Sequence, residues 1–197
     1  SGGAAEIVAA GRTGVRGLVG DAVQVKPGYE AAIAAVLGPL AEGVLVDSAA
    51  DAFALAADDE YGTVDYVMAD APRRAVTLPE VAGVTPAVDV VTAPDGVLGV
   101  LGHVLIADDL AAARSARTAL DALSDITTTV VTVGGDVVTA HTLRAGSGGE
   151  RSRLELAAER DAATERLQEL REVVDALRES RTEASERLET ARRTAKD

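Results

Sequence analysis

The sequence predicts a mixed α/β domain made of two similar halves and followed by a long coiled-coil helix. Two observations lead to this fold class. Short apolar stretches separated by Gly and Pro recur in matched pairs before residue 146, whereas residues 150–197 contain no Gly, Pro or aromatic side chain. An abrupt change of this kind marks the point where a globular domain passes into a long helix.

The composition is that of a folded chain with an aliphatic core. Apolar residues make up 47% of the sequence but aromatic residues only 2%, and Phe53 is the single Phe. Few rings are therefore available to stack on the bases of single-stranded nucleic acid. The chain has no Cys, which excludes disulfides, thiolate metal sites and a Cys nucleophile.

The negative charge is concentrated in the first part of the chain. Of the net charge of −13, residues 1–149 carry −11 and residues 150–197 only −2. A body this acidic repels phosphate over most of its surface, so any DNA contact must be confined to a local basic patch. No apolar run approaches the roughly 20 residues needed to cross a bilayer.

The first part of the sequence contains an internal repeat. Residues 21–38 and 88–102 each read as an apolar strand, a Pro-containing turn and an apolar stretch ending in Val-Leu-Gly. Further on, the apolar strands 44–48 and 104–108 lead into predicted helices at 49–57 and 110–123. The Ser and Asp residues between strand and helix, Ser48 and Asp108-Asp109, stand where an N-cap belongs.

A third pair of strands is predicted at 62–68 and 127–133, and a hairpin at 130–138 turns at Gly134-Gly135. We therefore expect one subdomain at about 14–78 and a second at about 84–146. The chain is therefore expected to divide into residues 1–13, 14–149 and 150–197. The first is expected to be the end of an incoming coiled-coil arm with tag residues, the second the globular domain, and the third the outgoing helix.

The last part of the chain has a heptad pattern. Apolar residues alternate at spacings of three and four over about four heptads, which predicts a coiled-coil seam. The seam residues are Leu167, Leu170, Val174, Leu177, Ala184 and Leu188. Arg160 and Arg181 interrupt it, as polar register-setting residues do. The alternative is a single amphipathic helix folded onto the domain.

No arrangement of residues predicts a catalytic or metal site. His103 and His141 are far apart in sequence and neither has an i, i+4 partner. The acidic run 58–60 reads as a loop that ends a helix. The sequence also lacks a G-x-x-x-x-G-K-[ST] phosphate loop and a G-x-S-x-G nucleophile elbow.

Four segments resemble the hinge domain of bacterial SMC (structural maintenance of chromosomes, condensin-type) proteins. They occur in the family's order, at 14–21, 29–38, 104–113 and 130–138. The most specific is YEAAIAAVLG at Tyr29–Gly38, which is similar to the family pattern Y-E-x-A-[IV]-x-x-x-L-G. The resemblance covers residues 14–149 and implies an SMC-hinge fold of two pseudo-repeated α/β subdomains with a coiled-coil arm leaving it.

The sequence departs from the family pattern after the predicted hairpin. The family has two glycine pairs there, which line the dimer contact, and Ala140-His141 stand in place of the first. By resemblance, one side of a dimer contact is expected to contain Gly14 and Gly17. The other side is expected to contain Gly146, Gly148 and Gly149.

The resemblance further implies a non-catalytic dimerisation module of a chromosome condensation and segregation ATPase. ATP and Mg²⁺ would bind at heads elsewhere in the full-length protein, so no cofactor is expected here. The expected partners are a second hinge, the antiparallel arm of the same chain and, weakly, DNA; a cytoplasmic, nucleoid-associated location is implied. The basic residues nearest the coil, which are candidates for DNA contact, are Arg12, Arg16, Arg144, Arg151 and Arg153.

One alternative belongs to a different functional class. A duplicated α/β domain that holds a small ligand in a cleft could signal along the helix. This alternative requires polar residues that converge near Gly38 and Gly102, and the sequence has few of them. A sensor of this kind would be stabilised by its ligand, whereas a hinge would self-associate without one.

Overall fold

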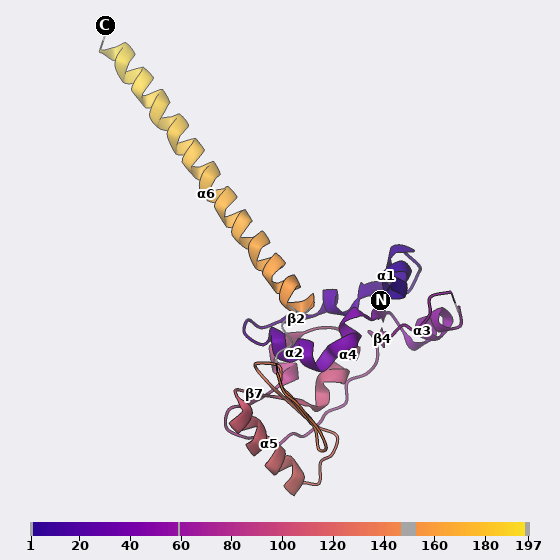
Figure 1. Ribbon diagram of the computed structural model, residues 1–197. Coiled ribbons are helices and arrows are strands. Elements are labelled where there is room, and N and C mark those ends of the chain that lie inside the picture. Colours follow the sequence, from indigo (N-terminus) through magenta and orange to yellow (C-terminus); the bar gives the residue numbers. More distant parts are fainter. Residues whose placement is uncertain (1, 59, 147–152, 196–197) are drawn as a thin grey trace. The chain divides into compact units, whose positions relative to one another are not determined.

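The computed structural model describes residues 2–58, 60–146 and 153–195. The chain divides into two units, Ser1–Ala158 and Glu159–Asp197. Each is described by itself, and Figure 1 shows the elements of both.

The first half of the globular unit is built on a three-stranded sheet with the strand order β1-β3-β4. β1 is antiparallel to β3, and β3 is parallel to β4. Helix α3 makes the connection between the two parallel strands. The elements are β1 (Val15–Leu18), β3 (Val44–Val46), α3 (Ala49–Ala56) and β4 (Tyr66–Met68).

The second half repeats this plan and then extends it. β5 is antiparallel to β7, and β7 is parallel to β8, with α5 between them. Two more antiparallel strands follow, so that the sheet has the order β10-β9-β8-β7-β5. The elements are β5 (Val84–Pro86), β7 (Val104–Ala107), α5 (Leu110–Ala122), β8 (Thr129–Thr132), β9 (Val137–Val138) and β10 (Leu143–Arg144).

The predicted repeat is confirmed by the remaining elements, which also occur in matched pairs. β2 and β6 pair with each other antiparallel, Gln24 opposite Thr92 and Val25 opposite Val91. Equivalent strands that pair in this way place an approximate two-fold axis between the halves. The matched elements are η1 (Val19–Ala22) with η3 (Ala87–Val90), β2 (Gln24–Val25) with β6 (Val91–Thr92), α2 (Glu30–Leu37) with α4 (Asp95–Val100), and η2 (Gly38–Glu42) with η4 (Leu101–His103).

Both predicted helix caps are present. The Ser48 hydroxyl accepts a hydrogen bond from the Asp51 N–H, and the Asp51 carboxylate accepts one from the Ser48 N–H, which completes a capping box at α3. Asp109 caps α5 by accepting from the Ala112 N–H at 2.8 Å. These local hydrogen bonds fix where each helix begins after its buried strand.

The two halves share one hydrophobic core. The central cluster takes Leu45 and Val67 from the first sheet and Ile106 and Val131 from the second. Each half also has a smaller cluster on the opposite face of its sheet, under α3 in the first and under α5 in the second. The halves repeat in topology, share the central cluster and each add one smaller cluster of their own.

Helix α1 (Gly2–Ala9) packs on the sheet of the first half. Ile7 and Ala4 are buried there beside Val44 and Val46. A Cβ on Gly3 would overlap the carbonyl oxygen of Tyr61, so a residue expected to belong to a tag sits in close backbone contact with the domain. The segment expected to be an incoming arm thus contributes to the core.

Helix α6 (Arg153–Thr194) is a single uninterrupted helix of 42 residues (Figure 1). Leu154 in its first turn is buried in the central core. Every described residue from Glu159 to Ala195 is exposed.

Candidate dimer interface

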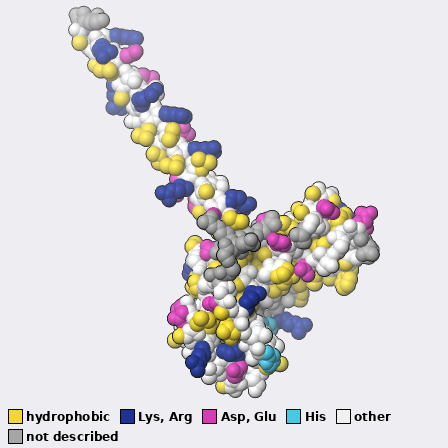
Figure 2. All heavy atoms as spheres, in the orientation of Figure 1, with side chains coloured by type: hydrophobic (Ala, Val, Ile, Leu, Met, Phe, Trp, Pro, Cys, Tyr) yellow, Lys and Arg dark blue, Asp and Glu magenta, His cyan; other side chains and the backbone are white. Residues whose placement is uncertain are grey.

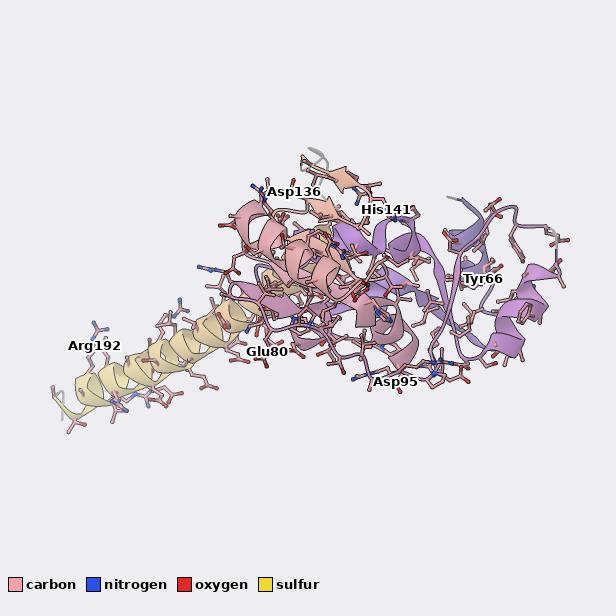
Figure 3. All side chains as sticks on the ribbon, turned by 90° about the horizontal axis from the view of Figure 1, so that it is seen from below. Tyr66, Glu80, Asp95, Asp136, His141 and Arg192 are labelled. Carbon is pink, nitrogen blue, oxygen red and sulfur yellow. The ribbon has the colours of Figure 1, made fainter. Side chains whose placement is uncertain are left out.

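The predicted hairpin is present and is followed by a second one. β8 and β9 pair with Val130 opposite Val138, and the turn between them holds Gly135 at φ +94°, where glycine is favoured. β9 and β10 then pair around a turn in which the Thr139 hydroxyl accepts from the Thr142 N–H at 2.9 Å. This turn contains His141, at the position where the family has glycines (Figure 3).

Asp136 holds the chain after β10 close to the hairpins. Its carboxylate accepts the Gly146 N–H at 3.0 Å and the Thr132 hydroxyl at 2.7 Å. These hydrogen bonds, the one from Gly146 first, lower the pKa of Asp136. The start of the predicted glycine segment is therefore fixed to the second sheet.

The glycines expected at the dimer interface differ in how much space the fold leaves for a side chain. Gly14 has φ +85°, and a Cβ there would lie 2.5 Å from the Asp51 side chain, so its own fold requires glycine. Gly17, at φ +137° beside a bulge in β1, has nothing within 4 Å of its Cβ position. Gly146, at φ +101°, is open in the same way, and Gly148 and Gly149 lie outside the described residues.

Within the part of the chain that the structure describes, the three-stranded and five-stranded sheets both end in strands with no neighbouring strand on one side. β1 and β4 are the edges of the first sheet, and β10 and β5 those of the second. An edge strand carries unpaired backbone N–H and C=O groups that can pair with another chain. β10 is also exposed at both of its residues, and the Leu143 side chain is 60% exposed.

The sequence matches a family model described as "SMC proteins Flexible Hinge Domain" over residues 12–117, more than half of the chain. The chain belongs to the SMC hinge family. It is 36% identical over 163 residues to a chromosome partition protein Smc of Mycobacterium leprae, and 32% identical over 166 residues to one of Mycobacterium tuberculosis. These matches cover 77% and 78% of the chain but only 13% of each relative, so the chain spans about an eighth of their length.

Solved hinge structures have the same fold. A crystal structure of an asymmetric dimer of the Geobacillus stearothermophilus SMC hinge domain matches with a TM-score of 0.71 and 26% identity, covering 89% of this chain and 76% of that one. A Pyrococcus furiosus Smc hinge domain with an extended coiled coil matches with a TM-score of 0.54 and 20% identity, covering 85% and 62% of the two chains. The second comparison bears on the fold alone.

Among the arginines that are candidates for DNA contact in this hinge, Arg12, Arg16 and Arg144 have described side chains, and each has a partner within the chain. Arg12 pairs with Asp58 at 2.8 Å, and the hydrogen bond that it donates to the Asp58 carboxylate raises the Arg12 pKa. Arg16 pairs with Asp47, and Arg144 donates to the Ala35 carbonyl oxygen at 2.7 Å. Arg151 and the Arg153 side chain lie outside the described residues. A phosphate would have to compete with these partners for Arg12 and Arg16.

The residues of the predicted seam all lie on the outgoing helix of this hinge, α6. Along α6, hydrophobic side chains lie among charged ones (Figure 2). The large seam side chains are between 44% and 64% exposed: Leu167, Leu170, Val174, Leu177 and Leu188. Ala184 is exposed as well. This is the surface that a partner helix of a coiled coil would cover.

The described residues of the hinge hold no cluster of three or more His, Cys, Asp or Glu side chains suited to a metal ion. His103 and His141 lie on different elements, η4 and the turn between β9 and β10. Within the same described ranges no helix is long and apolar enough to cross a membrane.

Sequence reasoning missed one feature, an apolar groove of about 410 Å³ between β4 and α4. We call it the α4 groove. Its lining residues include Val67, Val76, Gly99, Val100, Arg74 and His103. The groove is mostly apolar, and the polar side chains in its lining are Tyr66, Arg74 and His103. The two glycines of α4, Gly96 and Gly99, were its only signal in the sequence.

Proposed function

We propose that this chain is the homodimerisation hinge of a chromosome-partitioning SMC protein. The observation that carries the proposal is the pair of repeated sheets, each with free edges, in a chain of the SMC hinge family. A two-fold dimer needs a self-complementary surface, and two equivalent halves let each half of one hinge meet the opposite half of its partner. A hinge is a non-catalytic segment, and the ATPase heads and their Mg²⁺ would belong to the rest of the protein.

The glycines that remain candidates for the dimer contact are Gly17, Gly146, Gly148 and Gly149. Gly17 and Gly146 adopt backbone conformations that favour glycine and have open space where a side chain would be, which supports close approach of another backbone. Gly14 contributes less to this argument, because the Asp51 side chain of the same chain already explains why a glycine is needed there.

The helix α6 is proposed to pair with the antiparallel incoming arm of its own full-length chain. Its open seam is narrow and rich in Ala and Leu, which suits a single partner helix. Under these two proposals, the chain lies at the end of a long coiled coil that is opposite to the ATPase heads. The full-length protein would be cytoplasmic and associated with the nucleoid.

Homodimerisation through the globular unit is tested by capture between two differently tagged copies expressed together. We expect capture through one tag to retain the copy that carries the other tag, and to retain it equally when Leu170 and Leu177 are both changed to Glu, because these changes disrupt only the α6 seam. Capture that disappears in the seam variant would mean that α6, and not the hinge, joins the chains.

We propose DNA contact only as a weak, secondary property carried by Arg151 and Arg153. Arg12 and Arg16 are already paired with carboxylates, which makes them less available to phosphate. The net charge of −11 over residues 1–149 also repels phosphate. Changing Arg151 and Arg153 to Glu should lower the slope of log affinity against log salt by about 2 per chain. Electrophoretic shifts at several low salt concentrations measure this, and equal binding by both forms would contradict it.

A further inference from the structure

We propose that α6 presents a basic face that selects an acidic partner helix, the incoming arm of its own full-length chain, and prevents α6 from pairing with a second α6. This inference rests on the proposed pairing of α6 with that arm and adds the charge that the arm must carry. It follows from where arginines and carboxylates stand along the helix.

The heptad positions of α6 follow from its seam. Leu167 and Leu170 occupy positions a and d of a heptad lettered a to g, and Val174 begins the next heptad. Because α6 is one continuous helix from Arg153 to Thr194, the same lettering applies along its length. In a coiled coil, positions a and d face the partner, positions e and g flank the contact, and positions b, c and f face away.

The charges of α6 are segregated between these positions. From residue 160 to residue 194, positions a, d, e and g contain arginine but no acidic residue. Every acidic residue of this stretch lies at b, c or f, where Arg193 is the single basic residue. Figure 2 shows one face of α6, on which Lys and Arg side chains lie on either side of hydrophobic ones. The flanking arginines are Arg166, Arg171, Arg178, Arg187 and Arg192.

Two further arginines stand on the seam itself. Arg160 and Arg181 both occupy position a and are separated by three heptads (181 − 160 = 21 residues). The Arg160 guanidinium pairs with the adjacent Asp161 at 2.8 Å, and both side chains are 66% exposed. A guanidinium that a partner helix covers stays charged and loses water, so it requires a carboxylate opposite it. The partner is therefore expected to supply two carboxylates at the same separation.

The flanking arginines are held only weakly within α6. Arg178 lies 3.6 Å from the Asp175 carboxylate and Arg187 lies 3.4 Å from that of Glu183, each across one turn of the helix. Their side chains remain 76% and 81% exposed. Exposed pairs of this kind contribute little, so the guanidiniums are available to another chain segment. Charges at e and g set the choice of partner, and the helix that fits carries Asp or Glu at its own flanking positions.

The same charges disfavour pairing between the α6 helices of two copies. Flanking positions meet flanking positions in both parallel and antiparallel coiled coils. Between residues 160 and 194 none of these contacts could join an arginine to a carboxylate, and arginine would face arginine. Like charges across a contact act against the wrong partner, so each α6 is left for an acidic helix.

The basic face also fits an acidic helix better than it fits DNA. Phosphates would attract the arginines but would leave the Leu and Val side chains between them exposed. The carboxylates at b, c and f lie on the same narrow helix, within about 10 Å of the arginines, and repel phosphate. A helix with its own apolar seam covers the leucines and pairs the arginines at once.

The first test offers this chain two labelled peptides of four heptads, both with Leu at a and d, one with Glu and one with Lys at e and g. Fluorescence anisotropy should show the Glu peptide bound about a hundredfold more tightly, because every flanking contact changes from repulsion to attraction. Binding that survives when Leu170 and Leu177 are changed to Glu is subtracted as binding elsewhere. Equal affinity for the two peptides, or tighter binding of a 20-base-pair DNA duplex, would overturn the inference.

The second test compares Arg187→Glu with Arg193→Glu. Both arginines pair with a glutamate four residues earlier, at 3.4 and 3.8 Å, and are 81% and 84% exposed. They differ in position, because Arg187 stands at g and Arg193 at f. Arg187→Glu should weaken binding of the Glu peptide about threefold to tenfold, and Arg193→Glu less than about twofold. An equal loss would show that only the total charge matters, contrary to the inference.

The third test places a benzophenone amino acid at Ser185, an exposed e position, in the full-length protein. We expect mass spectrometry to find cross-links to a segment upstream of residue 1 in the same chain, with Asp or Glu beside its seam. Cross-links to a second α6, to DNA or to another protein would overturn the inference. A chain that is monomeric in solution but prefers the Glu peptide would lose the proposed homodimer and keep this inference. A dimer that does not distinguish the peptides would do the reverse.

Discussion

Changing Gly96 to Ala is expected to destabilise the hinge by about 3 kcal/mol or more, a large part of the 5–15 kcal/mol typical of a domain. A Cβ on Gly96 would overlap the Met68 carbonyl oxygen and lie 3.5 Å from the Ala69 nitrogen. The Gly96 N–H also donates to the Ala69 carbonyl oxygen at 3.2 Å. The backbone of α4 thus rests directly on the end of β4, and neither can give way as a flexible side chain would.

The cost arises because this contact joins the two halves. α4 belongs to the second half and β4 to the first, and the next residues of α4, Val97 and Leu98, are buried in the shared core. Moving α4 away to make room for a methyl group would loosen their packing as well. Urea unfolding followed by circular dichroism measures the loss.

Gly134→Ala is the matched control for Gly96→Ala. Gly134 is exposed, its φ is not in the left-handed region, and its Cβ position has no neighbour closer than 3.7 Å. We expect its unfolding free energy to stay within about 0.5 kcal/mol of the unmodified chain. A Gly96→Ala chain as stable as this control would show that α4 does not rest on β4 as described.

Changing Arg117 to Met is expected to lower the unfolding free energy by about 2–4 kcal/mol, because each lost hydrogen bond to a charged group is worth about 1.5–3 kcal/mol. Arg117 on α5 is only 9% exposed. Its guanidinium donates to the Thr128 carbonyl oxygen at 3.0 Å, to the Asp125 carbonyl oxygen, and to the Asp121 carboxylate at 2.8 Å. Met fills similar space but leaves two backbone acceptors without this donor.

The Arg117 contacts stabilise the turn between α5 and β8. Asp125 there accepts hydrogen bonds from the N–H and hydroxyl groups of Thr127 and Thr128, and the Thr128 hydroxyl contributes most to lowering the Asp125 pKa. Arg117→Lys should recover only part of the loss, because a single ammonium cannot serve all three acceptors as the guanidinium fork does.

Arg114→Met is the control for Arg117→Met, since Arg114 lies on the exposed side of the same helix. Its unfolding free energy should change by no more than about 0.5 kcal/mol. Thermal and urea unfolding of the three variants under one set of conditions decide the comparison. Equal effects at Arg114 and Arg117 would mean that the loss comes from helix charge and not from the buried contacts.

The features that the sequence predicts correctly are those with a local cause. Ser48 and Asp109 stand between a buried strand and a helix, and their capping hydrogen bonds span three residues. The hairpin at 130–138 and the long helix α6 likewise follow from short-range patterns in the sequence. The repeat could be recognised because each half reuses the same local pattern.

The features that were missed depend on residues distant in sequence. Gly14 needs glycine because the Asp51 side chain lies against it, and Gly96 because the Met68 carbonyl does. Such approaches leave no trace in spacing or composition. For the same reason Gly96 could not be told from Gly99, whose Cβ position has nothing within 4 Å, and the burial of Ile7 in the first sheet was not foreseen.

The central claim, that this hinge joins two chains, is tested most directly by its mass in solution. Light scattering over about a hundredfold range of concentration is wide enough to reveal a mass-action equilibrium. We expect about twice the chain mass of 20.1 kDa, held to the lowest concentrations for a tight dimer or declining smoothly for a weaker one. A mass of 20.1 kDa at every concentration would contradict the account.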